Sequence, residues 1–174
     1  TQFKRGDEVF GEVSRCGFGG YAEYVAARES VLALKPTNLS FEEAASVPTA
    51  GCTALQGLRK GKIQPAQKVL IHGASGGVGT FAVQIAKAKG GHVTAMASGR
   101  NDEYVRRLGA DVFIDYTKRP FEEMVRDMDV VFDTVGGDTF KRAFATCKPG
   151  GFLVTAVAFP TEEDRRHGIG VARV

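Results

Sequence analysis

One segment of this sequence constrains the fold more than any other. In VLIHGASGGVGTFAVQIAK, a continuous apolar run, a cluster of glycines and an amphipathic stretch follow one another. The apolar run is typical of a strand buried on both faces of a parallel sheet. The amphipathic stretch indicates a helix, and the glycines form the turn between the two. Strand, glycine-rich turn and helix in this order are the context that a dinucleotide-binding fingerprint requires.

The glycine-rich turn departs at one position from the G-x-G-x-x-G pattern, because Ala74 stands where the first glycine is expected and Gly73 comes before it. Gly76 would let the backbone approach a pyrophosphate, and Gly79 would let the helix pack closely on the strand. The free N–H groups at the start of the helix would face the phosphates. The alternative, a tight turn without a ligand, is disfavoured because so many glycines cost folding entropy. The predicted cofactor-binding residues of this turn are Ala74, Ser75, Gly76, Gly77 and Val78.

Strand-like and helix-like segments alternate from residue 68 to the end of the chain. The expected strands cover residues 69–74, 92–98, 112–116, 130–135 and 152–157. Helices are expected between successive strands, including a short one at 120–128, and the closing GIGVARV reads as the start of a further strand. This alternation predicts an α/β fold, a doubly wound parallel sheet of the Rossmann type with helices on both faces.

The chain ahead of this alternation has a different pattern. Residues 1–35 alternate in the half-buried manner of β-strands, with a short glycine-rich turn between them. Residues 40–60 read as helical, because Ser40 and Glu43 fit a capping box. Pro48 is expected to divide this stretch into two helices, since proline removes a backbone donor.

Charge and composition argue against several classes of function. The formal net charge is +3, and the 23 lysines and arginines form no block that favours nucleic acid. No apolar run approaches the ~20 residues of a membrane span, so we expect no membrane partner. The three cysteines form no CxxC pair and no metal-ligand spacing. We therefore expect no metal site, and reduced thiols in the cytoplasm.

The end of the second expected strand indicates which dinucleotide is bound. NAD-binding domains carry Asp or Glu there, about 20 residues past the glycines, to hold the ribose hydroxyls. This chain has Ser98, and Arg100 follows. A serine hydroxyl and a guanidinium can both bind a 2′-phosphate, and Tyr116 after the third strand could add a hydroxyl. The pattern predicts NADPH, although Arg100 could instead be a solvated loop charge and Tyr116 a partly buried aromatic.

Several segments carry a family resemblance in addition: GDEVFG, GGYAEYV, FEEAASVPTAGCTALQGL, the glycine-turn segment, LGADVFIDY, VFDTVGG and KPGGFLVT. On these motifs the chain resembles zinc-independent members of the medium-chain dehydrogenase/reductase superfamily, in the quinone oxidoreductase and enone reductase branch. The resemblance implies that residues 1–35 are the C-terminal strands of a chaperonin-10-like catalytic domain. Residues 36–174 would be an NADPH-binding Rossmann domain truncated at its last strand, so we expect an internal piece of a longer protein.

The resemblance also implies further site residues. Zinc-dependent relatives have a cysteine ligand at the position of Thr49, which is a poor zinc ligand, and this agrees with the expectation that no metal is bound. Thr53 matches a threonine that faces the nicotinamide. Matches to loops that contact the cofactor ribose or lie against the nicotinamide are Val135, Gly136, Ala156, Val157 and Ala158. Each of these could instead serve ordinary loop or core packing.

The function implied by the resemblance is hydride transfer from NADPH to a quinone or to the activated C=C bond of an enone or enal, by a homodimer acting on a small molecule. No catalytic residue is predicted, because the sequence offers no convincing general acid and no Tyr-x-x-x-Lys pair. Two alternatives stay open. The first is a protein that binds NADPH with little turnover, and the second is an NADPH-linked carbonyl or alcohol reductase.

Overall fold

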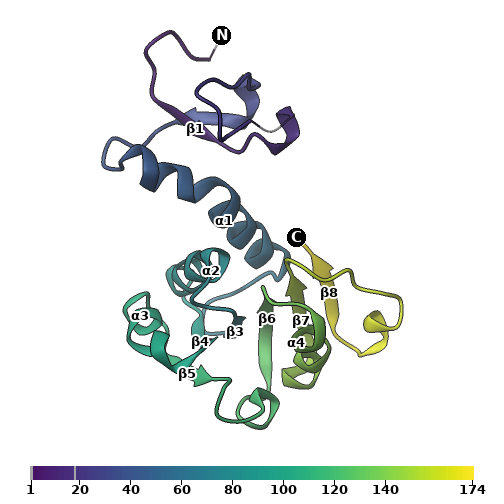
Figure 1. The fold of residues 1–174 in the computed structure, drawn as a ribbon. Coiled ribbons are helices and arrows are strands. Elements are labelled where there is room, and N and C mark those ends of the chain that lie inside the picture. The colour runs from purple at the N-terminus through teal and green to yellow at the C-terminus, as the bar shows by residue number, and fades with distance from the viewer. Residues whose placement is uncertain (1, 18) are drawn as a thin grey trace. The chain divides into compact units, whose positions relative to one another are not determined.

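The computed structural model describes residues 2–17 and 19–174. The chain forms two compact units, and the division between them falls after Cys52 (Figure 1). The domain boundary expected at residue 35 concerns the domains of a longer protein and stays a prediction.

The first unit contains a small antiparallel ladder. Strand β1, Val9–Gly11, pairs with β2, Leu32–Leu34, and single 3-10 turns cover Ser14–Cys16 and Glu29–Val31. The β structure expected over residues 1–35 is thus confined to two short strands. Among the described residues, 20–23 form a turn and a bend, and 24–28 pair with no strand.

Helix α1 covers Phe41–Lys60. The capping box is confirmed, since the Ser40 N–H donates to Glu43 Oε2 at 2.8 Å and the Glu43 N–H donates to Ser40 Oγ at 3.1 Å. The expected break at Pro48 is wrong, because the helix continues through it. A proline inside a helix costs about 3 kcal/mol, and burial of the apolar face of the later turns, including Leu58, offsets that cost.

The second unit is built on a parallel sheet of six strands in the order β5-β4-β3-β6-β7-β8 (Figure 1). The strands are β3 Lys68–His72, β4 His92–Ala97, β5 Val112–Asp115, β6 Met128–Asp133, β7 Cys147–Thr155 and β8 Gly170–Arg173. Chain order reverses between β3 and β6, and open α/β sheets bind ligands at the carboxyl ends of the strands beside such a switch. The predicted Rossmann sheet is confirmed.

Helices cover both faces of this sheet. Helix α2, Gly77–Ala88, and α3, Asp102–Arg107, share one core cluster with the last turns of α1 and with Val69 and Ile71 of β3. Helix α4, Gly137–Ala143, packs on the opposite face, where Leu70 of β3 lies. Neighbouring residues of one strand therefore face two cores, as the continuous apolar run requires.

The connection between β5 and β6 differs from the sequence expectation. In place of a helix over 120–128 it has one 3-10 turn, Phe121–Glu123. Asp127 adopts a left-handed conformation with φ of 58°, which is incompatible with a helix that runs into β6. Phe121 is buried in the second core cluster, so the segment is held by its aromatic side chain and not by helical periodicity.

Candidate nucleotide site

The turn between β3 and α2 is closed by two glycines. Gly73 has a φ of 66°, and a Cβ there would lie 2.5 Å from Thr134 Oγ1. At Gly79 a Cβ would lie 2.1 Å from the Gly73 carbonyl oxygen and 2.7 Å from Ala74 Cα. Gly73 thus makes the tight turn, although Ala74 occupies the first glycine position of the pattern. The close packing of helix on strand expected at Gly79 is confirmed.

The start of α2 is accessible from solvent. Gly76 is its N-cap residue in an extended conformation, and both Gly76 and Gly77 are exposed. A Cβ on Gly76 would approach only the Gly73 carbonyl oxygen, at 3.3 Å. The first N–H groups of a helix have no partner within it, and the helix dipole adds positive charge there. This end of α2 is therefore suited to bind an anion.

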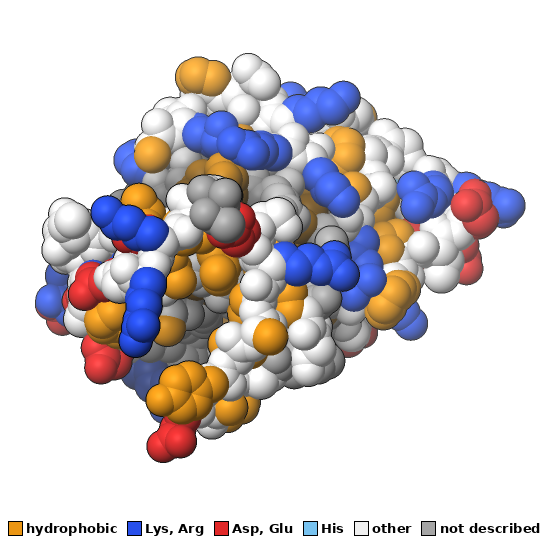
Figure 2. Space-filling view, turned by 90° about the horizontal axis from the view of Figure 1, so that it is seen from above, with side chains coloured by type: hydrophobic (Ala, Val, Ile, Leu, Met, Phe, Trp, Pro, Cys, Tyr) orange, Lys and Arg blue, Asp and Glu red, His pale blue; other side chains and the backbone are white. Residues whose placement is uncertain are grey.

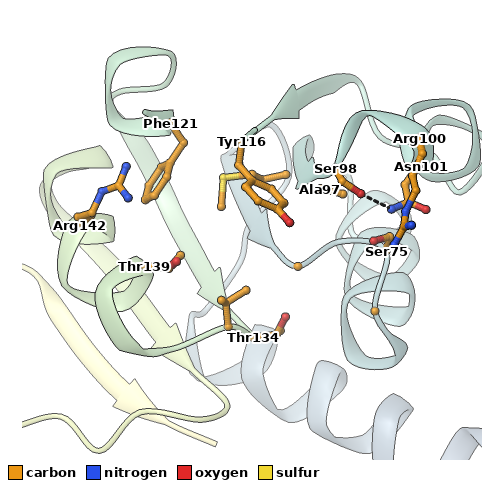
Figure 3. Close-up of a pocket in the computed structure, with 14 residues that line it drawn as sticks. Ser75, Ala97, Ser98, Arg100, Asn101, Tyr116, Phe121, Thr134, Thr139 and Arg142 are labelled. Carbon is orange, nitrogen blue, oxygen red and sulfur yellow. Dashed lines mark hydrogen bonds between the residues drawn. The ribbon is translucent and has the colours of Figure 1, made fainter. Parts of the chain in front are cut away.

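A cavity of about 480 Å³ lies beside this helix start, at the carboxyl ends of the central strands (Figure 3). Its lining residues are Gly73, Ser75, Gly76, Met96, Ala97, Ser98, Arg100, Asn101, Tyr116, Phe121, Thr134, Val135, Thr139 and Arg142. Figure 3 shows a polar end with Ser75, Ser98, Arg100 and Asn101, and an opposite end with Phe121, Thr139 and Arg142. The cavity is thus elongated, and Tyr116 lies between its ends.

The charges on the cavity wall are unbalanced. Of the described residues that line it, none is acidic, whereas two are arginines. The Arg142 guanidinium is already neutralised, because its Nε and Nη2 donate to the Glu122 carboxylate at 2.9 and 2.6 Å. This hydrogen bonding lowers the pKa of the Glu122 carboxyl. Arg100 is exposed and forms no ion pair within the described part of the chain. Arg100 is therefore the wall cation that is free to bind a ligand anion.

The loop that carries Arg100 is held by its neighbours. The Asn101 Nδ2 donates to Ser98 Oγ at 2.9 Å, which leaves the serine O–H free to donate. Asp115, at the end of β5, lies directly behind Gly99, where a Cβ would be 2.4 Å from its Oδ2. The Thr117 hydroxyl and N–H donate to the Asp115 carboxylate at 2.7 and 3.0 Å and lower its pKa. The Asp115 carboxylate is thus held by Thr117, and neither residue lines the cavity.

The predicted site residues fall into two groups. Those that line the cavity are Ser75, Gly76, Ser98, Arg100, Tyr116 and Val135. Those that do not line it are Thr53, Ala74, Gly77, Val78, Gly136, Ala156, Val157 and Ala158. The roles of both groups toward a cofactor stay predictions.

The residues outside the cavity lining have definite places in the fold. Ala74 is fully buried, and its N–H donates to the Met96 carbonyl at 3.0 Å. Gly77 and Val78 form the first turn of α2, and Thr53 lies on α1. The segment after β7 approaches the segment after β6, because a Cβ on Gly136 would be 2.7 Å from Val157 Cγ2.

Sequence reasoning missed several lining residues. Met96 and Ala97 are the last two residues of β4 and directly precede Ser98, so their position at a strand end could have marked them as lining residues. Thr139 and Arg142 lie on α4 and Phe121 on the β5–β6 connection, and no local pattern marks them as lining residues.

The described residues contain no group of three or more His, Cys, Asp or Glu side chains arranged to hold a metal ion. No helix in the described part of the chain is long and apolar enough to cross a membrane. On the face seen in Figure 2, Lys and Arg side chains lie among hydrophobic and neutral ones.

Comparisons with known proteins identify the family. A family model described as zinc-binding dehydrogenase matches residues 77–172, more than half of the chain. The 2-methylene-furan-3-one reductase of Solanum lycopersicum is 42% identical over 159 residues, which are 87% of this chain and 40% of that protein. The chloroplastic NADPH-dependent alkenal/one oxidoreductase of Arabidopsis thaliana is 42% identical over 159 residues, 87% of this chain and 41% of that protein.

Solved structures agree with the sequence matches. The quinone oxidoreductase from Coxiella burnetii superposes with a TM-score of 0.90 at 32% identity, over 100% of this chain and 57% of that one. The chain belongs to the zinc-binding dehydrogenase family, within the medium-chain dehydrogenase/reductase superfamily that its motifs resemble. It spans about two fifths of the length of the curated relatives named above.

Proposed function

We propose that the second unit of this chain binds NADPH, with the 2′-phosphate held by Arg100 and Ser98. The observation that carries the proposal is the exposed, unpaired Arg100 in a cavity whose described wall has no carboxylate. A phosphate oxygen would replace water on the guanidinium without displacing a protein partner, and charge-assisted hydrogen bonds are the strong ones. A ribose 2′-hydroxyl would gain much less from the same guanidinium.

The remaining predicted residues fit along the rest of the dinucleotide. The pyrophosphate would lie at the start of α2, against the backbone of residues 74–78. The Tyr116 hydroxyl would add a donor near the adenosine ribose. Val135 and Gly136 would contact the nicotinamide ribose, and Thr53 with residues 156–158 would border the nicotinamide ring.

We propose further that the complete protein is an NADPH-dependent reductase of quinones or of the activated C=C bond of enones and enals. The names of its relatives support this: one is an NADPH-dependent alkenal/one oxidoreductase, and another is a quinone oxidoreductase. Bound NADPH supplies the hydride, and the chain's own residues supply position and electrostatics. No side chain of this chain is assigned as a proton donor.

Turnover by the full-length protein tests this proposal. NADPH oxidation is followed with a panel of enones, enals, quinones and simple ketones, and NADH is the matched alternative cofactor. The expected result is turnover of enones or quinones with NADPH, at a KM about tenfold or more below that for NADH, because the 2′-phosphate gains charge-assisted hydrogen bonds. Tight NADPH binding without turnover would favour a binding protein, and turnover of ketones alone would favour a carbonyl reductase.

We also propose a homodimer, a cytoplasmic location and activity without zinc for the complete protein. In the described part of the chain β8 lies at one edge of the sheet, and edge strands can pair with a second copy of a chain. The cysteines of the described chain are free thiols, which suits a reducing compartment. Light scattering, cell fractionation and metal analysis of the full-length protein test these three points separately.

A further inference from the structure

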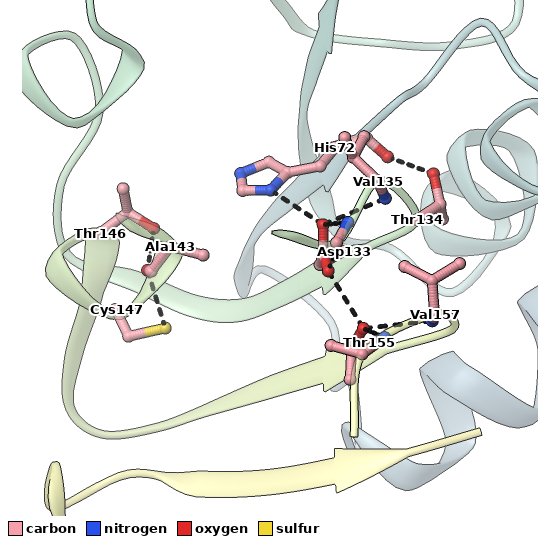
Figure 4. A network of polar contacts seen from close by, with 11 residues as sticks. His72, Asp133, Thr134, Val135, Ala143, Thr146, Cys147, Thr155 and Val157 are labelled. Atoms are coloured by element: carbon pink, nitrogen blue, oxygen red, sulfur yellow. Dashed lines mark hydrogen bonds and ion pairs between the residues drawn. The ribbon is translucent and has the colours of Figure 1, made fainter. Parts of the chain in front are cut away.

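A buried carboxylate organises the loop that follows β6. Asp133, the last residue of that strand, has no exposed surface. Its carboxylate accepts the N–H of Val135 at 3.1 Å and the N–H of Gly136 at 3.1 and 3.2 Å (Figure 4). The backbone of the β6–α4 turn is therefore folded around this side chain.

The same carboxylate is connected to the loop that follows β7. The Thr155 hydroxyl donates to Asp133 Oδ2 at 3.0 Å. The Thr155 Oγ1 in turn accepts the N–H groups of Val157 and Ala158 at 3.2 and 3.0 Å. One hydroxyl and one carboxylate thus join two loops that are separate in sequence, as Figure 4 shows.

A third strand end closes the network. His72 of β3 is fully buried, and its imidazole Nδ1 lies 3.6 Å from Asp133 Oδ1. The backbone carbonyl of His72 accepts a hydrogen bond from the Thr134 hydroxyl at 2.7 Å. Burial by itself would raise the pKa of the Asp133 carboxyl, but His72 and the N–H groups of Gly136 and Val135 bring that pKa below its ordinary value. The carboxylate is thereby kept as an acceptor at neutral pH.

These contacts add something that the sheet does not supply. The ladder between β6 and β7 already aligns the two strands and pairs Asp133 with Thr155. The last backbone bond of this ladder runs from the Ala156 N–H to the Asp133 carbonyl at 2.9 Å. The side-chain bonds extend past it, to the N–H groups of residues 135, 136, 157 and 158. Their effect is on the relative arrangement of the loops, because a buried N–H left without a partner costs free energy.

We propose that Asp133 and Thr155 are positioning residues that fix the loops 134–136 and 156–158 in one relative arrangement and thereby set the binding of the nicotinamide half of the cofactor. The inference rests on the proposed NADPH function. Neither side chain would touch the cofactor, because both are fully buried. The adenosine half, at Ser98 and Arg100, is formed by other strands.

The variant Thr155→Val tests the inference, since it keeps the side-chain shape and removes the hydroxyl. Thr155→Ser retains the hydroxyl and is the conservative rescue. Thr146→Val is the matched control, because Thr146 is equally buried and its hydroxyl donates only to the Ala143 carbonyl at 2.7 Å. In the full-length protein, the dissociation constants for NADPH and for adenosine 2′,5′-bisphosphate are measured by titration.

The expected result is selective. Thr155→Val weakens NADPH about tenfold, the scale expected for loss of buried hydrogen bonds, and changes adenosine 2′,5′-bisphosphate less than about twofold. Thr155→Ser and Thr146→Val behave as the wild type. Equal weakening of both ligands, or no weakening of either, overturns the inference.

A second variant covers the case in which Thr155→Val does not fold. In Asp133→Asn the side-chain oxygen still accepts from Val135 and Gly136, whereas the amide nitrogen cannot accept from Thr155. The same selective loss of NADPH affinity is expected, and unchanged affinity overturns the inference. If the wild type binds adenosine 2′,5′-bisphosphate and NADPH equally, the inference is wrong while the 2′-phosphate site stands; if it binds neither, the proposed function itself fails.

Discussion

Two glycine-to-alanine substitutions distinguish the two roles of the glycine-rich turn, which are close packing of α2 on β3 and space for a pyrophosphate. In Gly79→Ala the new Cβ would lie 2.1 Å from the Gly73 carbonyl oxygen and 2.7 Å from Ala74 Cα, and both contacts are to backbone. Helix α2 must move away from β3 to relieve them. In Gly76→Ala the nearest atom is the same carbonyl oxygen, but at 3.3 Å. The first substitution therefore strains the fold, and the second mainly occupies space that a pyrophosphate would need.

The expected loss of stability follows from these contacts. Overpacking costs about 1–3 kcal/mol, and a 2.1 Å backbone contact belongs at the upper end. Alanine regains about 1 kcal/mol over glycine within a helix, which leaves a net cost of about 2 kcal/mol for Gly79→Ala. In a chain of this size that lowers Tm by about 4–8 °C. For Gly76→Ala, about 0.4–1 kcal/mol from a less flexible unfolded chain offsets the tight contact, so Tm changes by less than about 2 °C.

Thermal unfolding followed by circular dichroism, with NADPH titration on the same samples, measures both effects. We expect Gly79→Ala to lose stability and Gly76→Ala to lose affinity for NADPH with its Tm preserved. A wild-type Tm for Gly79→Ala would show that α2 and β3 do not need their close approach at this position.

Two further predictions concern stability against pH and thiol reactivity. Burial by itself would raise the pKa of the Asp129 carboxyl, but the Lys148 ammonium and the Lys68 N–H bring that pKa below its ordinary value. The ionised carboxylate therefore stabilises the fold above about pH 4, and this contribution is lost as the pH falls below that. Asp129→Asn should lower the unfolding free energy by about 1–2 kcal/mol at pH 7 and by little near pH 2, and urea unfolding with an equal loss at both would contradict this. Burial raises the pKa of the Cys147 thiol to about 12. A thiol reagent at pH 8 should therefore leave Cys147 unmodified until urea is added, whereas the exposed Cys52 reacts at once. Labelling of Cys147 in the native protein at the rate of the unfolded protein would contradict this prediction.

The features that the sequence predicted correctly are local ones. The β3–α2 turn depends on residues within one short segment, so Gly73 and Gly79 could be read directly from their spacing. Ser98 and Arg100 line the cavity because they follow a strand, and strand ends meet at one edge of a parallel sheet. Periodicity was enough to find each of these strands.

The features that the sequence did not predict depend on distant partners. Whether an arginine on the cavity wall is free depends on its neighbours, and Arg142 is neutralised by Glu122 from another element. The link from Asp133 to Thr155 likewise joins separate strands. Pro48 was read as a helix end because its local cost is real, but burial of the later turns outweighs that cost. Tertiary contacts of this kind leave no pattern in a single sequence.

The two cavity arginines provide the most direct test of NADPH binding. Arg100→Gln and Arg142→Gln remove the same charge from the same cavity, and they differ in whether the guanidinium already has a carboxylate partner. Dissociation constants for NADPH and NADH are measured by titration of the full-length protein and both variants.

We expect Arg100→Gln to weaken NADPH binding by about 10- to 100-fold and to leave NADH binding within about twofold, since only NADPH carries the 2′-phosphate. Arg142→Gln should change the two affinities by the same factor. Equal loss of NADPH and NADH affinity in Arg100→Gln, or a selective loss of NADPH affinity in Arg142→Gln, would contradict the role of Arg100 as the 2′-phosphate ligand.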